Sequence, residues 1–416
     1  MKSKIQRKYY LDQLIQAKDR DVCKVVTGMR RSGKSFLLFE LFYDWVFKSG
    51  VTASHIIRID LETQKNKPLR DARKLYDFII SHLKGRGRYY VLLDEIQEVD
   101  GFEDLVNGLI QDHGLDVYIT GSNAKLLSKD INTRFRGRSV QIKVYPLSFY
   151  EYYSWLNRGA KKQINSADKK KAFYDYMLYG SLPYITRLSL KQEKTEYLSS
   201  MWETLLYRDI IERYNIKNIN VLDAVFDFLC SNIGSYVNAN KIANTLKSAG
   251  YKEITDDTVG NYLEYLCDSF LFYKAQRFDI KGRSYLKTQN KYYICDLGIR
   301  NAKLKFRQIE ITHSLENAVY LELIKRGYIV DIGKNYDKEI DFVVRTIDGG
   351  QCYIQVSYTI QDEKKLAQET ASIKNIKDGY RKYILTMDDD PFVNLENGIK
   401  KINVLDFLLE RYSLEF

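Results

Sequence analysis

Continuous apolar runs and helical spacing alternate along the first part of the chain. Four short runs are typical of buried strands: residues 22–26, 89–93, 115–120 and 139–144. Between the first two runs, apolar residues from Phe36 to Trp45 recur at helical spacing. Strands that alternate with helices favour a parallel sheet covered by helices. The pattern therefore predicts an α/β domain over residues 1–150.

The pattern changes twice in the middle of the chain. Residues 151–217 are typical of helices with lysine-rich interruptions, which we interpret as a helical lid with a solvated lysine face on the first domain. Residues 218–303 predict three helices followed by two strands, and Thr255 is placed to cap the third helix. Three helices and a basic turn between two strands predict a winged-helix domain.

Composition limits the classes of protein that the chain can represent. It has 416 residues, of which 45% are hydrophobic and 29% charged, and these values are typical of a folded protein with several domains. No apolar run approaches the ~20 residues that a membrane helix needs, and the basic N-terminus lacks the apolar core of a secretory signal. Five scattered cysteines predict neither disulfides nor a zinc site, and favour the cytoplasm. The net charge of +11 permits a polyanionic partner.

The segment TGMRRSGKSFLL carries the first candidate chemistry. A strand precedes this GxxxxGK[ST] sequence and a helix follows it, which is the context that a phosphate-binding P-loop requires. We expect ATP bound with Mg²⁺: the loop amides surround the phosphates, Lys34 reaches the β- and γ-phosphates, and the hydroxyl of Ser35 binds the metal ion. The predicted nucleotide-binding residues of this loop are Gly28, Met29, Arg30, Arg31, Ser32, Gly33, Lys34, Ser35 and Phe36.

Acidic and polar residues follow the next two strands. The run YVLLDE ends in Asp94, expected to hold Mg²⁺, and in Glu95, expected to act as general base toward the attacking water. The strand at 115–120 is followed by Ser122 and Asn123, and either could sense the γ-phosphate.

Arginines precede the last strand of the first domain. In NTRFRGR, Arg134 and Arg138 are candidates for an arginine finger that reaches the γ-phosphate of a neighbouring subunit, because Gly137 lets the loop project. This role would require a homo-oligomer, with a ring as one form. The alternative is a solvated basic loop.

The ordered set GMRRSGKS, LLDEIQ, ITGSNAKLLS, RGR and YPLSFYEYY resembles a large prokaryotic group of AAA+-type ATPases with a C-terminal domain of unknown function. The likeness continues through YGSLPYI, LYRDIIERYNI, EIDFVV and YIQVSYTI, and so spans nearly the whole chain. The resemblance implies ATP-dependent action, with nucleic acid as one candidate target, and it does not identify a substrate.

The basic turn of the predicted winged helix is a candidate DNA contact. We expect the third helix to enter a major groove and Lys281, Arg283, Lys287 and Lys291 to meet phosphates. The alternative is a protein-docking module, because charge alone indicates phosphate without indicating a base sequence.

Residues 304–416 have the skeleton of a restriction-endonuclease-like domain. A helix with Glu316, a strand with Asp341 and a strand with Gln355 match the carboxylate positions that hold Mg²⁺ in that skeleton. Ser357 stands where the skeleton has a lysine, so we expect a nuclease-like fold without a working nuclease.

Three functions fit these motifs. The first is an ATPase that couples hydrolysis to binding or remodelling of DNA. The second is a nucleotide-gated regulatory or defence switch with slow turnover, and the third, less favoured, is an ATP-dependent nuclease.

Overall fold

The computed structural model describes residues 4–127, 133–135, 137–158, 166–251, 253–307, 310–390 and 393–416. The chain divides into two compact units. Unit 1 comprises residues 1–146 with 268–270, and unit 2 comprises residues 147–267 with 271–416. Within the described part of the chain, no helix is both long enough and apolar enough to span a membrane.

Unit 1 is built on a five-stranded sheet in the order β2-β3-β4-β1-β5, and all four strand pairs are parallel. Its elements are α1 (Lys8–Ala17), β1 (Cys23–Thr27), α2 (Lys34–Phe36), a π-helical segment (Leu37–Phe42), α3 (Tyr43–Lys48), β2 (Ile56–Asp60), α4 (Ala72–Ser81), β3 (Tyr90–Asp94), α5 (Phe102–His113), β4 (Asp116–Gly121) and β5 (Ser139–Lys143). Short 3-10 turns lie at Ala53–His55, Gln64–Arg70, Ile96–Glu98 and Ala124–Leu127.

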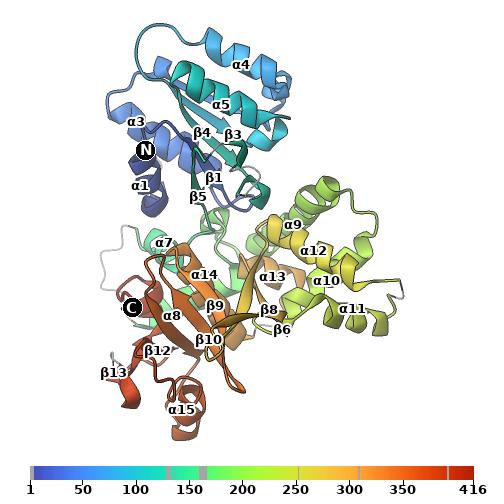
Figure 1. Ribbon diagram of the computed structural model, residues 1–416, viewed down its shortest axis with the longest axis vertical. Coiled ribbons are helices and arrows are strands. Elements are labelled where there is room, and N and C mark those ends of the chain that lie inside the picture. Colours follow the sequence, from blue (N-terminus) through green and yellow to red (C-terminus); the bar gives the residue numbers. More distant parts are fainter. Residues whose placement is uncertain are drawn as a thin grey trace. The chain divides into compact units, whose positions relative to one another are not determined.

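Successive residues of each strand point to opposite faces of this sheet, and a different set of helices covers each face. Val25, Val91 and Val117 pack with α4 and α5 on one face. Val26, Leu92 and Tyr118 pack with α1, α3 and the π-helical segment on the other. The two helical layers flank the sheet in Figure 1. Because all strands are parallel, their carboxyl ends meet at one edge, and the predicted P-loop and acidic residues lie there.

Unit 2 begins with helices and continues into a mixed sheet. Its helices are α7 (Phe149–Leu156), α8 (Ser166–Tyr179), α9 (Lys191–Leu206), α10 (Ile219–Ser231), α11 (Ala239–Ser248), α12 (Asp256–Asp268), α13 (Leu297–Lys303), α14 (Ile311–Lys325), α15 (Glu363–Thr370) and α16 (Val404–Leu408). A π-helical segment (Tyr207–Glu212) follows α9, and 3-10 turns lie at Pro183–Arg187 and Glu396–Gly398. Its strands are β6 (Tyr236–Val237), β7 (Phe272–Asp279), β8 (Ser284–Ile294), β9 (Ile329–Asn335), β10 (Lys338–Arg345), β11 (Gln351–Ser357), β12 (Arg381–Thr386), β13 (Val393–Asn394) and β14 (Ile399–Asn403).

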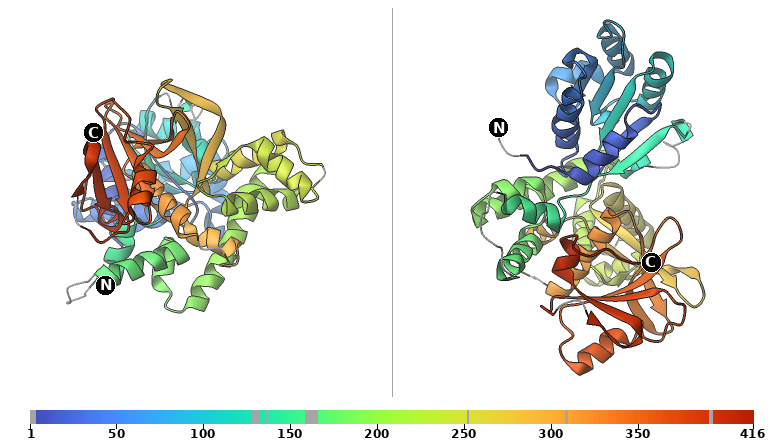
Figure 2. Two further views of the ribbon diagram at one scale, coloured as in Figure 1. Left: turned by 90° about the horizontal axis from the view of Figure 1, so that it is seen from below. Right: turned by 90° about the vertical axis from the view of Figure 1, so that its left-hand side faces the viewer.

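One nine-stranded sheet joins the stretches expected to be separate domains. Its order is β13-β14-β12-β11-β10-β9-β7-β8-β6, and the parallel pairing of β7 with β9 connects the hairpin after α12 to the C-terminal strands. These strands, yellow to red, can be followed in both views of Figure 2. The sheet joins the stretches 218–303 and 304–416, and the helices of 151–217 lie in the same unit. The expected boundaries at residues 217 and 303 therefore remain predictions about sequence modules.

Close contacts at Gly180 and Gly298 hold α8 against α13. Asp296 caps α13 through the amide of Ile299, and its carboxylate also accepts hydrogen bonds from the amide and hydroxyl of Ser181. Gly180 has φ +77°, and a Cβ there would lie 2.1 Å from Oδ1 of Asp296; a Cβ on Gly298 would lie 2.2 Å from the carbonyl oxygen of Tyr179. The motif YGSLPYI thus depends on close backbone approach.

We predict that Gly180→Ala destabilises unit 2 by about 2–5 kcal/mol, because left-handed strain adds to a clash with the buried Asp296. Gly379→Ala is the matched control, since Gly379 has φ +78° with no atom within 4 Å of the added Cβ, and it should cost only about 1–2 kcal/mol. Urea unfolding monitored by fluorescence in a Trp45→Phe background reports on unit 2, where Trp155 and Trp202 lie. Equal losses in the two variants would contradict the role of this contact.

Candidate nucleotide-binding site

The predicted phosphate loop connects β1 to α2 and requires glycine at two positions. Gly28 has φ +147°, and a Cβ there would lie 2.0 Å from the carbonyl oxygen of Val144. Gly33 has φ +101° and precedes the first turn of α2, whose leading amides have no partner inside the helix. The loop therefore has the backbone geometry and the helix N-terminus that suit an anion.

Lys34 directs its ammonium group into the loop. Its Nζ donates to the carbonyl oxygens of Gly28 and Met29 at 3.0 and 3.1 Å, and to Oγ of Ser122 at 2.9 Å. Only 4% of this residue is exposed. The buried cation is thus held by the walls of the loop that we expect to receive phosphate.

The remaining loop residues occupy different environments. Met29 and Ser32 are fully buried, Phe36 packs partly buried beside α1 and α3, and Arg31 is exposed with φ +66°. Arg30 donates to Glu62 at 2.7 Å, just beyond the end of β2. Oγ of Ser32 has no hydrogen-bond partner among the described residues. A buried hydroxyl left without a partner in this loop fits a site completed by a ligand.

Asp94 ends β3 beside two hydroxyl groups. The hydroxyl of Thr120 donates to its carboxylate, and Ser35 is a second side-chain hydrogen-bond partner. Burial and, to a smaller extent, the neighbouring charge of Glu95 raise the pKa of Asp94 to about 6, against the lowering effect of these hydroxyls. The structure brings Ser35 and Asp94 together, while their role as metal ligands remains a prediction.

Glu95 is held in an uncommon backbone conformation, with φ +53°. Its amide donates to Oγ1 of Thr120 at 3.0 Å, and its carboxylate accepts hydrogen bonds from Ser122, with oxygen separations of 2.9 and 3.0 Å, and from Gln97. Burial raises the pKa of Glu95, but the charge of Lys34, 3.8 Å away, and the hydrogen bond from Gln97 outweigh it and leave the pKa below its ordinary value. Glu95 is therefore ionised beside the loop.

Ser122 is the better placed of the two candidate sensors. Its hydroxyl accepts from Lys34 and donates to Glu95, so it connects the phosphate loop to the expected base. Asn123 is buried next to it. From the sequence, either residue could sense the γ-phosphate, and the contacts favour Ser122.

Three residues of the site were missed from the sequence. Arg7 is buried and donates to the carbonyl oxygens of Ser32 at 3.0 Å and Tyr145 at 2.6 Å, bracing the loop from the N-terminal segment. Gln97 holds Glu95, and Thr120 contacts both Asp94 and Glu95. Thr120 ends an apolar strand and could have been noticed. Arg7 lies in a basic segment with no local signal.

The two candidate finger arginines lie apart. Arg134 is 3.3 Å from Glu103 in the first turn of α5, and its side chain is 65% exposed. Arg138 is exposed and its carbonyl oxygen accepts from the amide of Cys23, so it lies at the amino-terminal edge of the sheet. The P-loop follows the carboxyl end of β1, at the opposite end of the strands. Arg138 therefore cannot reach the nucleotide site of its own chain. Arg136, between them, falls outside the described residues.

Glu316, Asp341 and Gln355 are brought together in unit 2. The amide of Asp341 donates to Oε1 of Gln355 at 3.4 Å, and the negative charge of Glu316 adds to burial in raising the pKa of Asp341 well above its ordinary value. Ser357 is also buried and donates to the carbonyl oxygen of Thr359. Among the described residues, no three Asp, Glu, His or Cys side chains converge as a metal site requires.

Lys291 supplies the positive charge of this cluster. Its Nζ lies 2.9 Å from Glu316 and 2.6 Å from Glu339, and the side chain is 4% exposed. The expectation that Lys291 meets DNA phosphates from an exposed turn is therefore wrong, because β8 pairs within the sheet and turns this residue inward. Lys281 and Arg283 are exposed at the turn, and the side chain of Lys287 falls outside the described residues.

Comparison with known proteins shows which families and relatives this chain is similar to. Residues 20–153 match a family described as AAA domain, and residues 170–310 match a domain of unknown function. An uncharacterised protein of Haemophilus influenzae is 37% identical over 98% of this chain and 100% of its own length. One of Methanocaldococcus jannaschii is 31% identical over 92% and 84%.

The chain belongs to one family with these two uncharacterised proteins, and its residues 20–153 match the AAA domain. A Walker-type ATPase of Pyrococcus abyssi has a similar fold, with a TM-score of 0.52 and 14% identity over 72% of this chain and 96% of that one. The mixed α/β architecture with a parallel sheet is that of a P-loop ATPase core.

We predict that Asp94→Asn stabilises ligand-free unit 1 at pH 7.5 by about 1–3 kcal/mol. The folded pKa of about 6 lies above the ordinary value of 3.8, so ionisation costs the folded state stability as the pH rises through this window. The gain should disappear near pH 4, where the wild-type carboxyl is protonated in the folded state. Urea unfolding monitored through Trp45, with Trp155 and Trp202 changed to phenylalanine, measures both conditions.

The control for this variant is Asp100→Asn, a change at an exposed position that should leave the unfolding midpoint of unit 1 unaltered. A gain of equal size at pH 4 and pH 7.5 would show that the stabilisation does not come from the charge of Asp94.

Proposed function

We propose that unit 1 binds ATP with Mg²⁺ and hydrolyses it. The observation that carries the proposal is the convergence of Lys34, Ser35, Asp94, Glu95 and Ser122 at the carboxyl ends of three adjacent parallel strands. The unpartnered hydroxyl of Ser32 inside the loop supports a ligand there. The match of residues 20–153 to the AAA domain supports the choice of nucleotide.

Each residue has a distinct task in this proposal. Lys34 exchanges its bonds to the loop carbonyls for phosphate oxygens, and Ser35 with Asp94 would hold Mg²⁺, which when bound neutralises developing negative charge on the phosphates. Glu95, ionised at neutral pH, accepts the proton of the attacking water. Ser122 and Gln97 orient its carboxylate. Arg7 keeps the loop at a fixed position relative to the segment after β5.

Glu95→Gln should retain ATP binding and lower the rate of hydrolysis by at least about 100-fold, because it removes the proton acceptor and preserves shape. Lys34→Ala should lose ATP binding itself, because it removes the ammonium group that is buried inside the loop against the carbonyl oxygens of Gly28 and Met29. Equilibrium binding of a fluorescent ATP analogue and release of phosphate measure the two quantities separately. Normal turnover by Glu95→Gln would require a different base, and wild-type affinity in Lys34→Ala would refute the assignment of the loop.

We also propose a homo-oligomer in which Arg138 or Arg134 completes the site of the next subunit. Support comes from the position of Arg138 at the sheet edge opposite its own P-loop. The same Glu95→Gln protein, mixed with Arg138→Ala, should then recover hydrolysis from sites that combine an intact Glu95 with an intact arginine. Absence of recovery at every mixing ratio leaves Arg134 as the remaining candidate, tested in the same way.

In unit 2 we propose three modules: a helical lid at 151–217, a winged helix at 218–303 and a restriction-endonuclease-like fold at 304–416. The order α10, β6, α11, α12, β7, β8 supports the second, and the grouping of Glu316, Asp341 and Gln355 supports the third. Nuclease activity is not proposed, because Lys291 neutralises the carboxylates and Ser357 is bonded to the backbone.

DNA coupling is the second candidate function, and two adjacent hairpin tips favour it. Lys281 and Arg283 are exposed on one tip, and Tyr336 on the other is 66% exposed. Nζ of Lys281 lies 4.6 Å from the ring centre of Tyr336. Cations beside an exposed aromatic ring suit a nucleic-acid strand.

The charge of α12 favours the alternative, a nucleotide-gated switch. The exposed face of this helix carries Asp256, Asp257 and Glu264, which the phosphates of a major groove would repel. If unit 2 binds DNA, the hairpin tips are therefore the better contact than the third helix.

Replacing both Lys281 and Arg283 with glutamate should weaken binding of all DNA sequences alike. The plot of log affinity against log salt concentration should become less steep, by about 0.9 in slope for each lost duplex phosphate contact. The control is the double variant Lys364→Glu, Lys377→Glu, which makes the same change of charge at exposed positions near α15. Fluorescence anisotropy over a salt series measures both. Equal weakening by the two double variants would indicate net charge alone and would favour the gated switch.

A further inference from the structure

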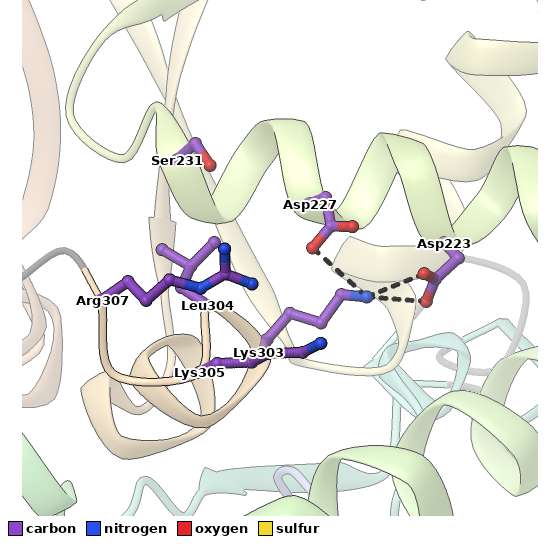
Figure 3. A pocket seen from close by; sticks show the side chains of 7 residues that line it. All are labelled: Asp223, Asp227, Ser231, Lys303, Leu304, Lys305 and Arg307. Carbon is purple, nitrogen blue, oxygen red and sulfur yellow. Dashed lines mark hydrogen bonds and ion pairs between the residues drawn. The ribbon is translucent and has the colours of Figure 1, made fainter.

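A polar cavity lies between α10 and the end of α13, entirely within unit 2. Its volume is about 440 Å³, and seven residues line it: Asp223, Asp227, Ser231, Lys303, Leu304, Lys305 and Arg307. Figure 3 shows the α10 residues on one wall and the residues after α13 on the other. None of these residues belongs to the candidate ATP site.

The carboxylates of the cavity are already neutralised in part. Nζ of Lys303 lies 2.8 Å from both carboxylate oxygens of Asp223 and 3.2 Å from Oδ1 of Asp227, and it stands 4.2 Å from the ring centre of Trp202. The side chain of Lys303 is 8% exposed, so this ammonium is fixed in the wall. Asp223 and Asp227 stay partly open to the cavity and can accept further hydrogen bonds.

Two more cations face the cavity without such partners. Lys305 and Arg307 are exposed, and within the part of the chain that the structure describes neither side chain forms a hydrogen bond or a close ion pair, although the charge of Lys305 acts on Asp227. Figure 3 shows the guanidinium of Arg307 directed toward the α10 wall below Ser231, with the ammonium of Lys305 beside Lys303. A forked guanidinium, an ammonium and a hydroxyl are the donors that bind a phosphate group.

The turn that presents these cations has an unusual sequence for its conformation. The amide of Phe306 bonds to the carbonyl oxygen of Asn301 at 2.7 Å and that of Lys305 to Ala302 at 2.9 Å, the pattern that ends a helix with a left-handed residue. Glycine is the usual residue there, yet Lys305 occupies it with φ +53°, and Phe306 follows with φ +55°. Lys305 thus occupies a left-handed position where glycine would be less strained.

We propose that this cavity binds a phosphate monoester of nucleotide size. Arg307, Lys305 and the hydroxyl of Ser231 hold the phosphate, and the open oxygens of Asp223 and Asp227 accept hydrogen bonds from hydroxyl or amino groups of the ligand. The volume falls within the ~300–1,000 Å³ typical of small-molecule sites. A free nucleotide and the 5′-terminal phosphate of a nucleic-acid strand share this chemistry. The site is independent of the proposed ATPase function.

The test uses the full chain with Lys34→Ala, which removes the P-loop as a competing phosphate site. Titration calorimetry with AMP should show one site, and adenosine, which lacks the phosphate, should bind at least about tenfold more weakly. Arg307→Gln should weaken AMP binding by at least about tenfold. Lys364→Gln, an equal change of charge on α15, should leave the affinity unchanged.

Lys305→Gly separates binding from folding. It removes the ammonium and relieves the left-handed strain, so AMP affinity should fall while the melting temperature stays equal to or above that of the parent. If this variant unfolds, Arg307→Gln alone decides. A 5′-phosphorylated dinucleotide that binds more tightly than AMP identifies a strand end as the ligand, and the reverse order identifies a free nucleotide.

Three results would overturn the proposal: no AMP binding at about 10 mM, equal binding of adenosine and AMP, or AMP affinity within twofold of the parent in both Arg307→Gln and Lys305→Gly.

Discussion

The buried ammonium of Lys34 is the charge around which the candidate site of unit 1 is arranged. Two loop carbonyls, the hydroxyl of Ser122 and the carboxylate of Glu95 surround it. Without this cation Glu95 would be an uncompensated buried charge, and the loop carbonyls would lose a shared donor. In the proposed site, ligand binding would therefore exchange the partners of Lys34: phosphate oxygens would take the place of the carbonyls, next to Glu95 and Ser122.

Unit 2 uses a second buried lysine for a different purpose. Lys291 on β8 is paired with Glu316 of α14 and Glu339 of β10, so one ammonium connects the hairpin after α12 to the C-terminal strands. The parallel pairing of β7 with β9 makes the same connection through the backbone. The ammonium of Lys291 thus lies within the carboxylate cluster and balances part of its negative charge. The cluster is better described as a joint between modules than as a reaction centre.

Local patterns were sufficient to predict four of the five strands of unit 1 and the positions of Lys34, Asp94 and Glu95, since a glycine loop between a strand and a helix is a contiguous signal. The fifth strand, β2, was not predicted. Arg7 was missed because its contacts with Ser32 and Tyr145 join distant segments of the chain. Gln97 lies only two residues from Glu95, and its role was overlooked because the sequence does not show that its side chain turns back to that carboxylate. Lys291 was assigned to an exposed turn because basic residues near a hairpin favour that interpretation, whereas its ion pairs with Glu316 and Glu339 join segments that are distant in the sequence. The DNA-binding roles of Lys281 and Arg283 remain predictions.

The contact between Ser181 and Asp296 constrains the order in which unit 2 can fold. The two residues are 115 positions apart, and the close approach of Gly180 and Gly298 leaves no alternative packing for α8 against α13. Closing so long a loop is entropically costly and must precede the contacts that reward it. During synthesis, the helices after residue 147 cannot complete their core until α13 has left the ribosome, whereas all five strands of unit 1 are available by residue 143. We therefore expect the sheet of unit 1 to form first, while the helices of unit 2 expose apolar faces until α13 has been made.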